Sequence, residues 1–210
     1  METKTRAFSL LEALLALGLF SLLMTLTLSF IAPMIRASQR GSDLSDLRGE
    51  AAMTLESICQ DIEQSAAPGI VVTSNVIPQV PVTLSVQQVL ALSSTGTTLW
   101  SPQVHIYSWD NSRRQIRLLK CPPTPSGVAT SVTQNRPCRW APADLILLVS
   151  TNAQSTFLSG DVADFNIVGP SAHGLSGAIH IKIKLQRRTG DFVQTFSLEQ
   201  AAMPAVRNTH

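Results

Sequence analysis

Charged and aromatic residues are both scarce in this sequence. Charged residues make up 14% and aromatic residues 5% of the 210 positions, and the formal net charge is +2. So weak a charge gives no large electrostatic field for holding nucleic acid or an acidic surface. The length allows one anchor segment and one globular domain with a core, but not two ordinary domains.

The sequence also lacks the residue patterns that catalysis and metal binding need. No H-E-x-x-H, C-x-x-C, G-x-S-x-G or G-x-x-x-x-G-K motif occurs, and the histidines share no metal-ligand spacing. His105 and His180 alternate with apolar strand residues, so we expect both to be exposed strand positions. We therefore expect no enzyme, no metal site and no cofactor, and an anchored hydrolase, the enzymatic alternative, has no candidate site. The four histidines are His105, His173, His180 and His210.

Cysteine occurs three times. Cys121 and Cys138 flank a proline-rich stretch that is typical of a loop, and we expect a disulfide between them. Closing a loop of this size stabilises a fold by about 3 kcal/mol in the chain-entropy picture and requires an oxidising compartment. The alternative is two unpaired loop thiols in a reducing cytosol. Cys59 falls on a helical apolar stripe and is expected to be a small buried hydrophobe.

Apolar residues are concentrated near the N-terminus. The run from Phe8 to Ala32 has about 25 residues, which gives roughly 37 Å of helix against a hydrocarbon core of about 30 Å. Lys4 and Arg6 precede the run, and the first cation after it is Arg36. The positive-inside rule therefore places the N-terminus in the cytoplasm and everything after Arg36 outside.

Two simpler interpretations of this run are a cleaved signal peptide and a plain membrane anchor. A signal peptide has a shorter apolar region, roughly 7 to 15 residues, followed by a small-residue cleavage site. A plain anchor fits the length but does not explain Glu12, the one ionisable side chain in the run. Because a carboxylate inside a membrane costs on the order of 2.5 kcal/mol or more, Glu12 is a candidate functional residue.

The segment Ala7-Phe8-Ser9-Leu10-Leu11-Glu12 resembles the type IV prepilin cleavage motif, in which a small residue precedes an aromatic one and a glutamate follows four positions later. The resemblance implies a dedicated peptidase and methyltransferase that cuts between Ala7 and Phe8 and methylates the new Phe8 amine. It also implies that Glu12 of one subunit pairs with the Phe8 ammonium of a neighbour, where low dielectric lets the pair fix register. Ala7 departs from the family, which usually has glycine before the cut.

A helix is also predicted beyond the apolar run. Pro33 is expected to bend or locally melt the helix where it leaves the bilayer. A second helical signal begins at Ser42 and Asp43, which are good N-cap types, and is expected to end at Ala67-Pro68-Gly69. Its apolar stripe has the 3.6-residue period of an amphipathic helix and consists of Leu44, Leu47, Ala51, Leu55, Ile58 and Ile62.

After Gly69 the pattern changes to short β-type runs separated by proline, glycine, asparagine and serine. Two hairpins are predicted, with turns at Asp110–Ser112 and Thr189–Asp191. The expected fold class is therefore α+β, with a long helix packed on an antiparallel sheet. The predicted strands span residues 70–73, 82–92, 104–109, 115–120, 145–150, 164–168, 179–186 and 192–198.

The C-terminal part carries a second resemblance. The stretch from Phe157 to Phe165, the alternating hairpin from Ile179 and the closing Val206-Arg207-Asn208 resemble the J-type minor pseudopilins of type II secretion and the similar W-type minor pilins. The resemblance implies a non-enzymatic subunit that initiates or caps a pilus-like or secretion filament, in the inner membrane and in contact with sibling subunits. The implied segments are a leader (1–7), a transmembrane and filament-core helix (8–35), an amphipathic continuation (36–67) and an extracytoplasmic β-rich domain (68–210).

A basic cluster near the last hairpin supports an alternative function. Together with the tryptophans, these cations could form a DNA-binding tip on a competence-type pilus, so the alternative is an envelope-anchored DNA-binding or adhesive module. A solvated strand face explains the same cluster without a partner. The cations are Lys182, Lys184, Arg187 and Arg188, and the tryptophans are Trp100, Trp109 and Trp140.

Overall fold

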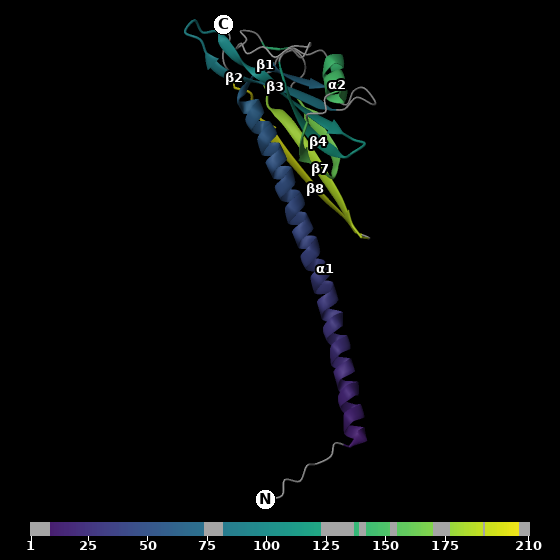
Figure 1. Ribbon diagram of the computed structural model, residues 1–210. Helices are drawn as coiled ribbons and strands as arrows, with labels where there is room; N and C mark the ends of the chain where they lie inside the picture. The colour runs from purple at the N-terminus through teal and green to yellow at the C-terminus, as the bar shows by residue number, and fades with distance from the viewer. Residues whose placement is uncertain are drawn as a thin grey trace, which may run out of the picture. The chain divides into compact units, whose positions relative to one another are not determined.

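Figure 1 shows the computed structural model, which describes residues 9–73, 82–122, 137–138, 142–151, 155–169, 177–190 and 192–205. The chain divides into two compact units, residues 1–45 and 46–210. Helix α1 (Leu10–Glu63) runs through the boundary between them. The remaining described elements all belong to the second unit, in which strands in two antiparallel sheets accompany a short helix, α2 (Pro142–Thr151). The fold is therefore α+β, as expected.

The described part of the first unit is the first part of helix α1, which is apolar and exposed from Leu10 to Ile35. Its most apolar window of 18 residues has a mean hydropathy of 2.3, and none of that window is buried. Large apolar side chains between Leu10 and Ile35 are 44 to 83% exposed. Helix α1 thus contains a segment that is long and apolar enough to cross a membrane.

Helix α1 continues through Pro33 and Gly41 without a break. The predicted local melting at Pro33 is therefore wrong, and Ser42 does not begin a separate helix. Melting one turn would create two further helix ends with unpaired backbone groups, whereas a proline removes only one backbone hydrogen bond. Hydroxyl groups in the run donate to carbonyls three or four residues earlier, which satisfies them inside the helix; they belong to Ser21, Thr25, Thr27 and Ser29.

The predicted amphipathic stripe is confirmed from Leu47 onward, whereas Leu44, which lies in the first unit, is 45% exposed. The fully buried members are Leu47, Ala51, Leu55, Ile58 and Ile62. Helix α1 ends at Glu63, earlier than the predicted stop at Ala67–Gly69, because these residues belong to strand β1 (Ser65–Thr73). Pro68 disfavours helical backbone at the residue before it, and the Ser65 hydroxyl already donates to the Gln87 carbonyl on the neighbouring strand at 2.6 Å.

Five strands form sheet A and three form sheet B, and every neighbouring pair is antiparallel. Sheet A has the order β1, β2 (Thr83–Leu92), β3 (Thr98–Asp110), β4 (Gln115–Cys121) and β5 (Thr156–Ser159). Sheet B has the order β6 (Val162–Val168), β7 (Ile179–Thr189) and β8 (Phe192–Ala202). Both predicted hairpins are confirmed, as β3–β4 and β7–β8.

One predicted strand is wrong and one strand was missed. Residues 145–150 lie in helix α2, and the short strand β5 had no prediction. A short apolar run does not distinguish a buried strand from a buried helix, but the contacts here have helical spacing. Leu145 is fully buried and Leu148 and Val149 pack against the same cluster, while Leu147 is 62% exposed.

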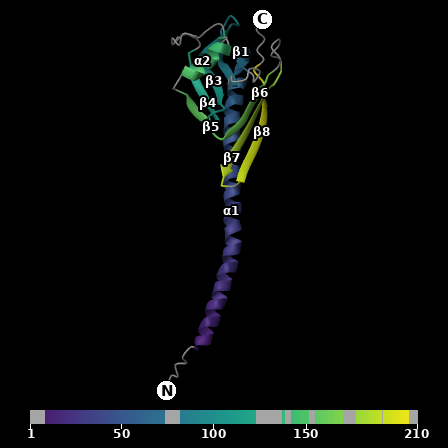
Figure 2. The same cartoon turned by 90° about the vertical axis from the view of Figure 1, so that its right-hand side faces the viewer.

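The main core lies between residues 47–62 of α1 and the inner faces of both sheets (Figure 2). Apolar residues of sheet B, among them Phe165, Ile181 and Ile183, are fully buried against it. A second, smaller cluster lies on the opposite face of sheet A, beneath α2. Sheet A is thus covered on both faces, by α1 on one side and by α2 on the other.

Candidate functional site

The predicted processing residues Ala7 and Phe8 lie outside the described residues. Ser9 caps α1: its carbonyl accepts from the Glu12 N–H at 3.0 Å and from the Ala13 N–H at 3.2 Å, and its hydroxyl accepts from the Glu12 N–H at 3.3 Å. Glu12 therefore lies in the first turn, where the helix dipole favours a negative charge. Ser9-x-x-Glu12 also matches the capping-box pattern, which the sequence reasoning overlooked.

The exposed apolar surface of α1 is the largest chemical feature of the first unit. Leu10 is 83% exposed, Leu15 61% and Phe30 74%, so leaving this helix in water exposes a continuous hydrophobic surface. Removing apolar surface from water is favourable, and exposed patches of this kind mark membrane or protein contacts. A surface of this kind is suited to contact with lipid or with other apolar helices.

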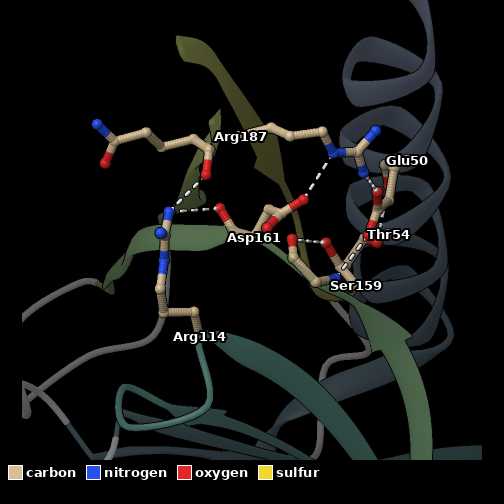
Figure 3. Close-up of polar contacts among 8 residues, drawn as sticks. Glu50, Thr54, Arg114, Ser159, Asp161 and Arg187 are labelled. Atoms are coloured by element: carbon tan, nitrogen blue, oxygen red, sulfur yellow. Dashed lines mark hydrogen bonds and ion pairs between the residues drawn. The ribbon is translucent and has the colours of Figure 1, made fainter. Parts of the chain in front are cut away.

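A network of charges joins α1 to the two sheets, as Figure 3 shows. Glu50 on α1 accepts from the Gly160 N–H at 2.6 Å and pairs with Arg187 of β7 at 3.4 Å. Arg187 also donates to Asp161, between β5 and β6, at 2.7 Å. These side chains are 22 to 38% exposed, so solvent screens the ion pairs only in part.

Arg114 completes this junction from the turn between β3 and β4. Its guanidinium donates to the Gln186 carbonyl at 2.5 Å and to the Asp161 carbonyl at 3.3 Å. Arg114 and Asp161 both have left-handed backbone, with φ of 53° and 54°. The Val162 N–H donates to the Arg114 carbonyl at 2.9 Å, so backbone and side chain together hold sheet A beside sheet B. Because each acid here meets an arginine or a backbone donor, the network can hold elements in place.

A second polar cluster surrounds Asp61 near the end of α1. One carboxylate oxygen meets His105 Nδ1 at 2.5 Å and accepts from the Tyr107 hydroxyl at 2.5 Å, and the other accepts from Gln88 at 2.8 Å. Burial acts to raise the pKa of Asp61, but the hydrogen bonds from His105 and Tyr107 outweigh it and hold this pKa below its ordinary value. Burial, followed by the bond to Asp61, raises the pKa of Tyr107.

The prediction that His105 is an exposed strand position is wrong, because its side chain is only 14% exposed and contacts Asp61. The available signal was Asp61 itself, which follows Ile58 by three positions and so lies on the buried helix face. A buried carboxylate needs donors, and histidine and tyrosine on a facing strand can supply them. His180, by contrast, is exposed as predicted and lies 3.5 Å from Glu199. No group of three or more metal-ligating side chains is found in the part of the chain that the structure describes.

The predicted basic cluster does not form one cationic surface. Arg187 points to the carboxylates of the charge network. Lys182 and Lys184 are exposed on sheet B, but Lys182 has Glu199 directly opposite on β8, and Lys184 has Asp164 directly opposite on β6. This balance of charge favours a solvated strand face.

The tryptophans are not gathered beside these cations either. Trp100 is 2% exposed and lies tightly against Gly69. Trp109 is partly buried and packs against the main core, and Trp140 lies outside the described residues. Exposed aromatic faces on which bases stack are the feature that single-strand binding requires, and neither described tryptophan offers one.

The three cysteines are free thiols on two different faces of sheet A. Cys59 is buried in the main core, as predicted. Cys121 is 4% exposed in the second cluster, and Cys138 packs against that cluster. Burial, and to a smaller extent the nearby Cys138, raise the pKa of Cys121 to about 11, and burial raises the pKa of Cys138 to about 11. The expected partners are therefore neighbours, without the expected bond between them.

The sites described above are of two kinds: contacts that hold the second unit together, and an exposed apolar surface on α1 that is suited to contact with lipid or other apolar helices. Comparisons with models of protein families, with curated proteins and with solved structures found no match to this chain. Function is therefore inferred from the chemistry of α1, where Glu12 is the one ionisable residue between Leu10 and Ile35.

Proposed function

We propose that this chain is a minor pilin or pseudopilin: a non-enzymatic subunit that initiates or caps a pilus-like or type II secretion filament. One observation carries the proposal. Helix α1 supplies both an apolar segment whose side chains are 44 to 83% exposed and, from Leu47 onward, a stripe buried in a folded domain. A helix of this kind can be stored in lipid and later packed against neighbouring α1 helices.

The N-terminal residues fix how the α1 helices of neighbouring subunits are aligned along their length. In the proposed mature subunit the chain begins at Phe8, whose methylated amine carries a positive charge four positions before Glu12. Away from water, the pair of Phe8 on one subunit and Glu12 on its neighbour is strongly favoured over two unpaired charges. Buried polar pairs of this kind fix register between helices more than they add stability.

The proposed setting is the inner membrane, crossed once, with the N-terminus in the cytoplasm and residues 46–210 outside. The partners are sibling pilin or pseudopilin subunits and the peptidase that cuts after Ala7. The second unit would present the sheets and loops by which siblings are told apart. The charge network around Arg187 supports this role because it fixes the two sheets to α1.

Substitution of Glu12 tests the proposal. We expect Glu12→Ala to leave membrane insertion unchanged and to reduce strongly the amount of protein recovered in sheared filaments, because the Phe8 amine loses its partner. The readouts are membrane fractionation, filament recovery, and mass spectrometry of the N-terminus of the membrane-extracted chain.

Ser9→Ala is the matched control for this experiment. It removes the helix cap, at a cost of about 1 kcal/mol, but keeps the Glu12 carboxylate. If Ser9→Ala assembles normally and Glu12→Ala does not, the carboxylate and not helix fraying is responsible. Unchanged assembly of Glu12→Ala, or a mature chain that begins at Met1 or beyond Ala32, would refute the proposal.

A further inference from the structure

The outer face of sheet A brings two cysteines together over a buried amide. Gln87, Val104 and Cys121 lie directly opposite one another on β2, β3 and β4, and so form one row across the sheet. Gln87 is fully buried. Its amide nitrogen donates to the Ser101 carbonyl at 2.7 Å, and its amide oxygen accepts from the backbone N–H of Cys138 at 2.7 Å.

This arrangement fixes the backbone of Cys138 independently of its thiol. A buried amide must satisfy both its donor and its acceptor, and Cys138 supplies the donor that the oxygen of Gln87 requires. Cys121, at the other end of the row, places its sulfur 3.9 Å from the Val104 carbonyl, in the middle of the row. Cys121 therefore ends the three-residue row on which Gln87 holds the Cys138 backbone, and both cysteines pack in the same cluster.

We propose that Cys121 and Cys138 form a disulfide and that Gln87 is its positioning residue, because it holds the Cys138 backbone above the row that ends in Cys121. Cys59 does not compete for either partner. It lies in the core between α1 and sheet A, whereas Cys121 and Cys138 lie on the opposite face of that sheet. The inference is independent of the proposed filament function.

The oxidant is a disulfide of the thiol–disulfide oxidoreductase class, or oxidised glutathione in vitro. The half-buried Cys138 loses its proton, and its thiolate attacks one sulfur of the donor, whose other sulfur leaves as a thiol. Cys121 then loses its proton and attacks the Cys138 sulfur of this mixed disulfide, which releases the second donor thiol. Two protein thiols are oxidised to one disulfide, and the donor disulfide is reduced to two thiols. Because burial raises the pKa of both thiols to about 11, the uncatalysed reaction accelerates as pH rises.

Thiol counting tests the bond itself. Full-length protein in detergent is oxidised with oxidised glutathione, denatured, alkylated and digested without reduction, and the peptides are identified by mass spectrometry. We expect one alkylated cysteine, Cys59, and one peptide pair that joins Cys121 to Cys138. Three alkylated cysteines, or a bond that includes Cys59, would overturn the proposal.

Reoxidation kinetics test the role of Gln87. After reduction, we expect Gln87→Leu to close the disulfide about tenfold more slowly, roughly the effect of losing one hydrogen bond. The glutathione adduct of Cys138 should accumulate, because only the intramolecular step is slowed. Gln103→Leu, at an exposed position of β3, is the matched control and should reoxidise at the wild-type rate.

General destabilisation would give a different result, since a loosened fold exposes both thiols and speeds adduct formation. If Gln87→Leu loses the native circular dichroism spectrum, Gln87→Asn takes its place, because its shorter amide falls short of Cys138. Closure of the disulfide at the wild-type rate in the folded variant, with no accumulated adduct, would overturn the positioning role.

Discussion

Gly69 offers a strict test of how α1 passes into sheet A. A Cβ added to Gly69 would lie 2.3 Å from the Trp100 ring and 2.9 Å from the Gln87 carbonyl oxygen. Neither neighbour can withdraw easily, because Trp100 is 2% exposed and the carbonyl belongs to the backbone of β2. The substitution Gly69→Ala therefore overpacks the site, which typically costs about 1 to 3 kcal/mol.

A second glycine in the same chain serves as a control for the predicted change in stability. Around Gly49, in α1, nothing lies within 4 Å of an added Cβ. Gly49→Ala should therefore stabilise the protein by up to about 1 kcal/mol, the difference in helix propensity between the two residues. At roughly 2 to 4 °C per kcal/mol for a domain of this size, Gly69→Ala lowers Tm by about 2 to 12 °C and Gly49→Ala raises it by up to about 4 °C.

The assay is thermal unfolding of the full-length protein in detergent, followed by near-ultraviolet circular dichroism, to which Trp100 contributes. Trp100→Leu removes the ring that the new methyl group meets, so the double variant Gly69→Ala/Trp100→Leu should lose less than the sum of the two single changes. Opposite shifts of Tm for the two glycine variants support the observed packing. A Gly69→Ala variant as stable as the wild type would show that β1 does not approach Trp100 in this way.

Four further substitutions test the other contacts of the second unit. Because the pKa of Asp61 is lowered in the folded state, its stabilising contribution is present above its unfolded pKa and is lost as pH falls through the folded value. Asp61→Asn should therefore flatten the acid side of a stability-against-pH curve measured by urea unfolding. Arg187→Met removes the cation between two carboxylates and should cost about 1 to 2 kcal/mol in urea, with a smaller loss at high salt. Leu145→Ala should lower the free energy of unfolding by about 2 to 5 kcal/mol and Leu147→Ala by under about 0.5, whereas a strand would place both on one face and give similar losses.

The regular parts of the second unit could be predicted because one physical pattern decides each of them. In β7, Ile179 to Leu185 alternate between buried apolar and exposed polar positions, which specifies a half-buried strand and its hairpin partner. The stripe from Leu47 to Ile62 repeats with helical period, and the structure buries all of it. In both cases the local period and the tertiary burial agree, so sequence alone is sufficient.

Prediction failed where tertiary contacts overrode the local pattern. Pro68 and Gly69 disfavour helical backbone, so the sequence predicts that the helix ends there. Pairing of Ser65 with β2 ends it earlier. Strand β5 has only four residues and is defined by its partner β4, which no short sequence window reveals. In the Asp61 cluster, His105 lies 44 positions and Tyr107 46 positions after Asp61 in the sequence. The cluster therefore depends on how α1 faces β3.

The local contacts of Glu12 bear on whether it needs a partner from another subunit. The cap formed by Ser9 uses the backbone N–H of Glu12 and not its carboxylate. A carboxylate in the first turn gains about 0.3 to 1 kcal/mol from the helix dipole, whereas a charge at the centre of a bilayer costs roughly 2.5 to 3.5 kcal/mol. The dipole therefore offsets only part of the cost of withdrawing Glu12 from water. Near the membrane surface the side chain can reach the headgroups, but inside a bundle of helices it must either take up a proton or meet a neighbouring cation. The proposed Phe8 ammonium meets that requirement, which is why the loss of Glu12 should affect assembly and not insertion.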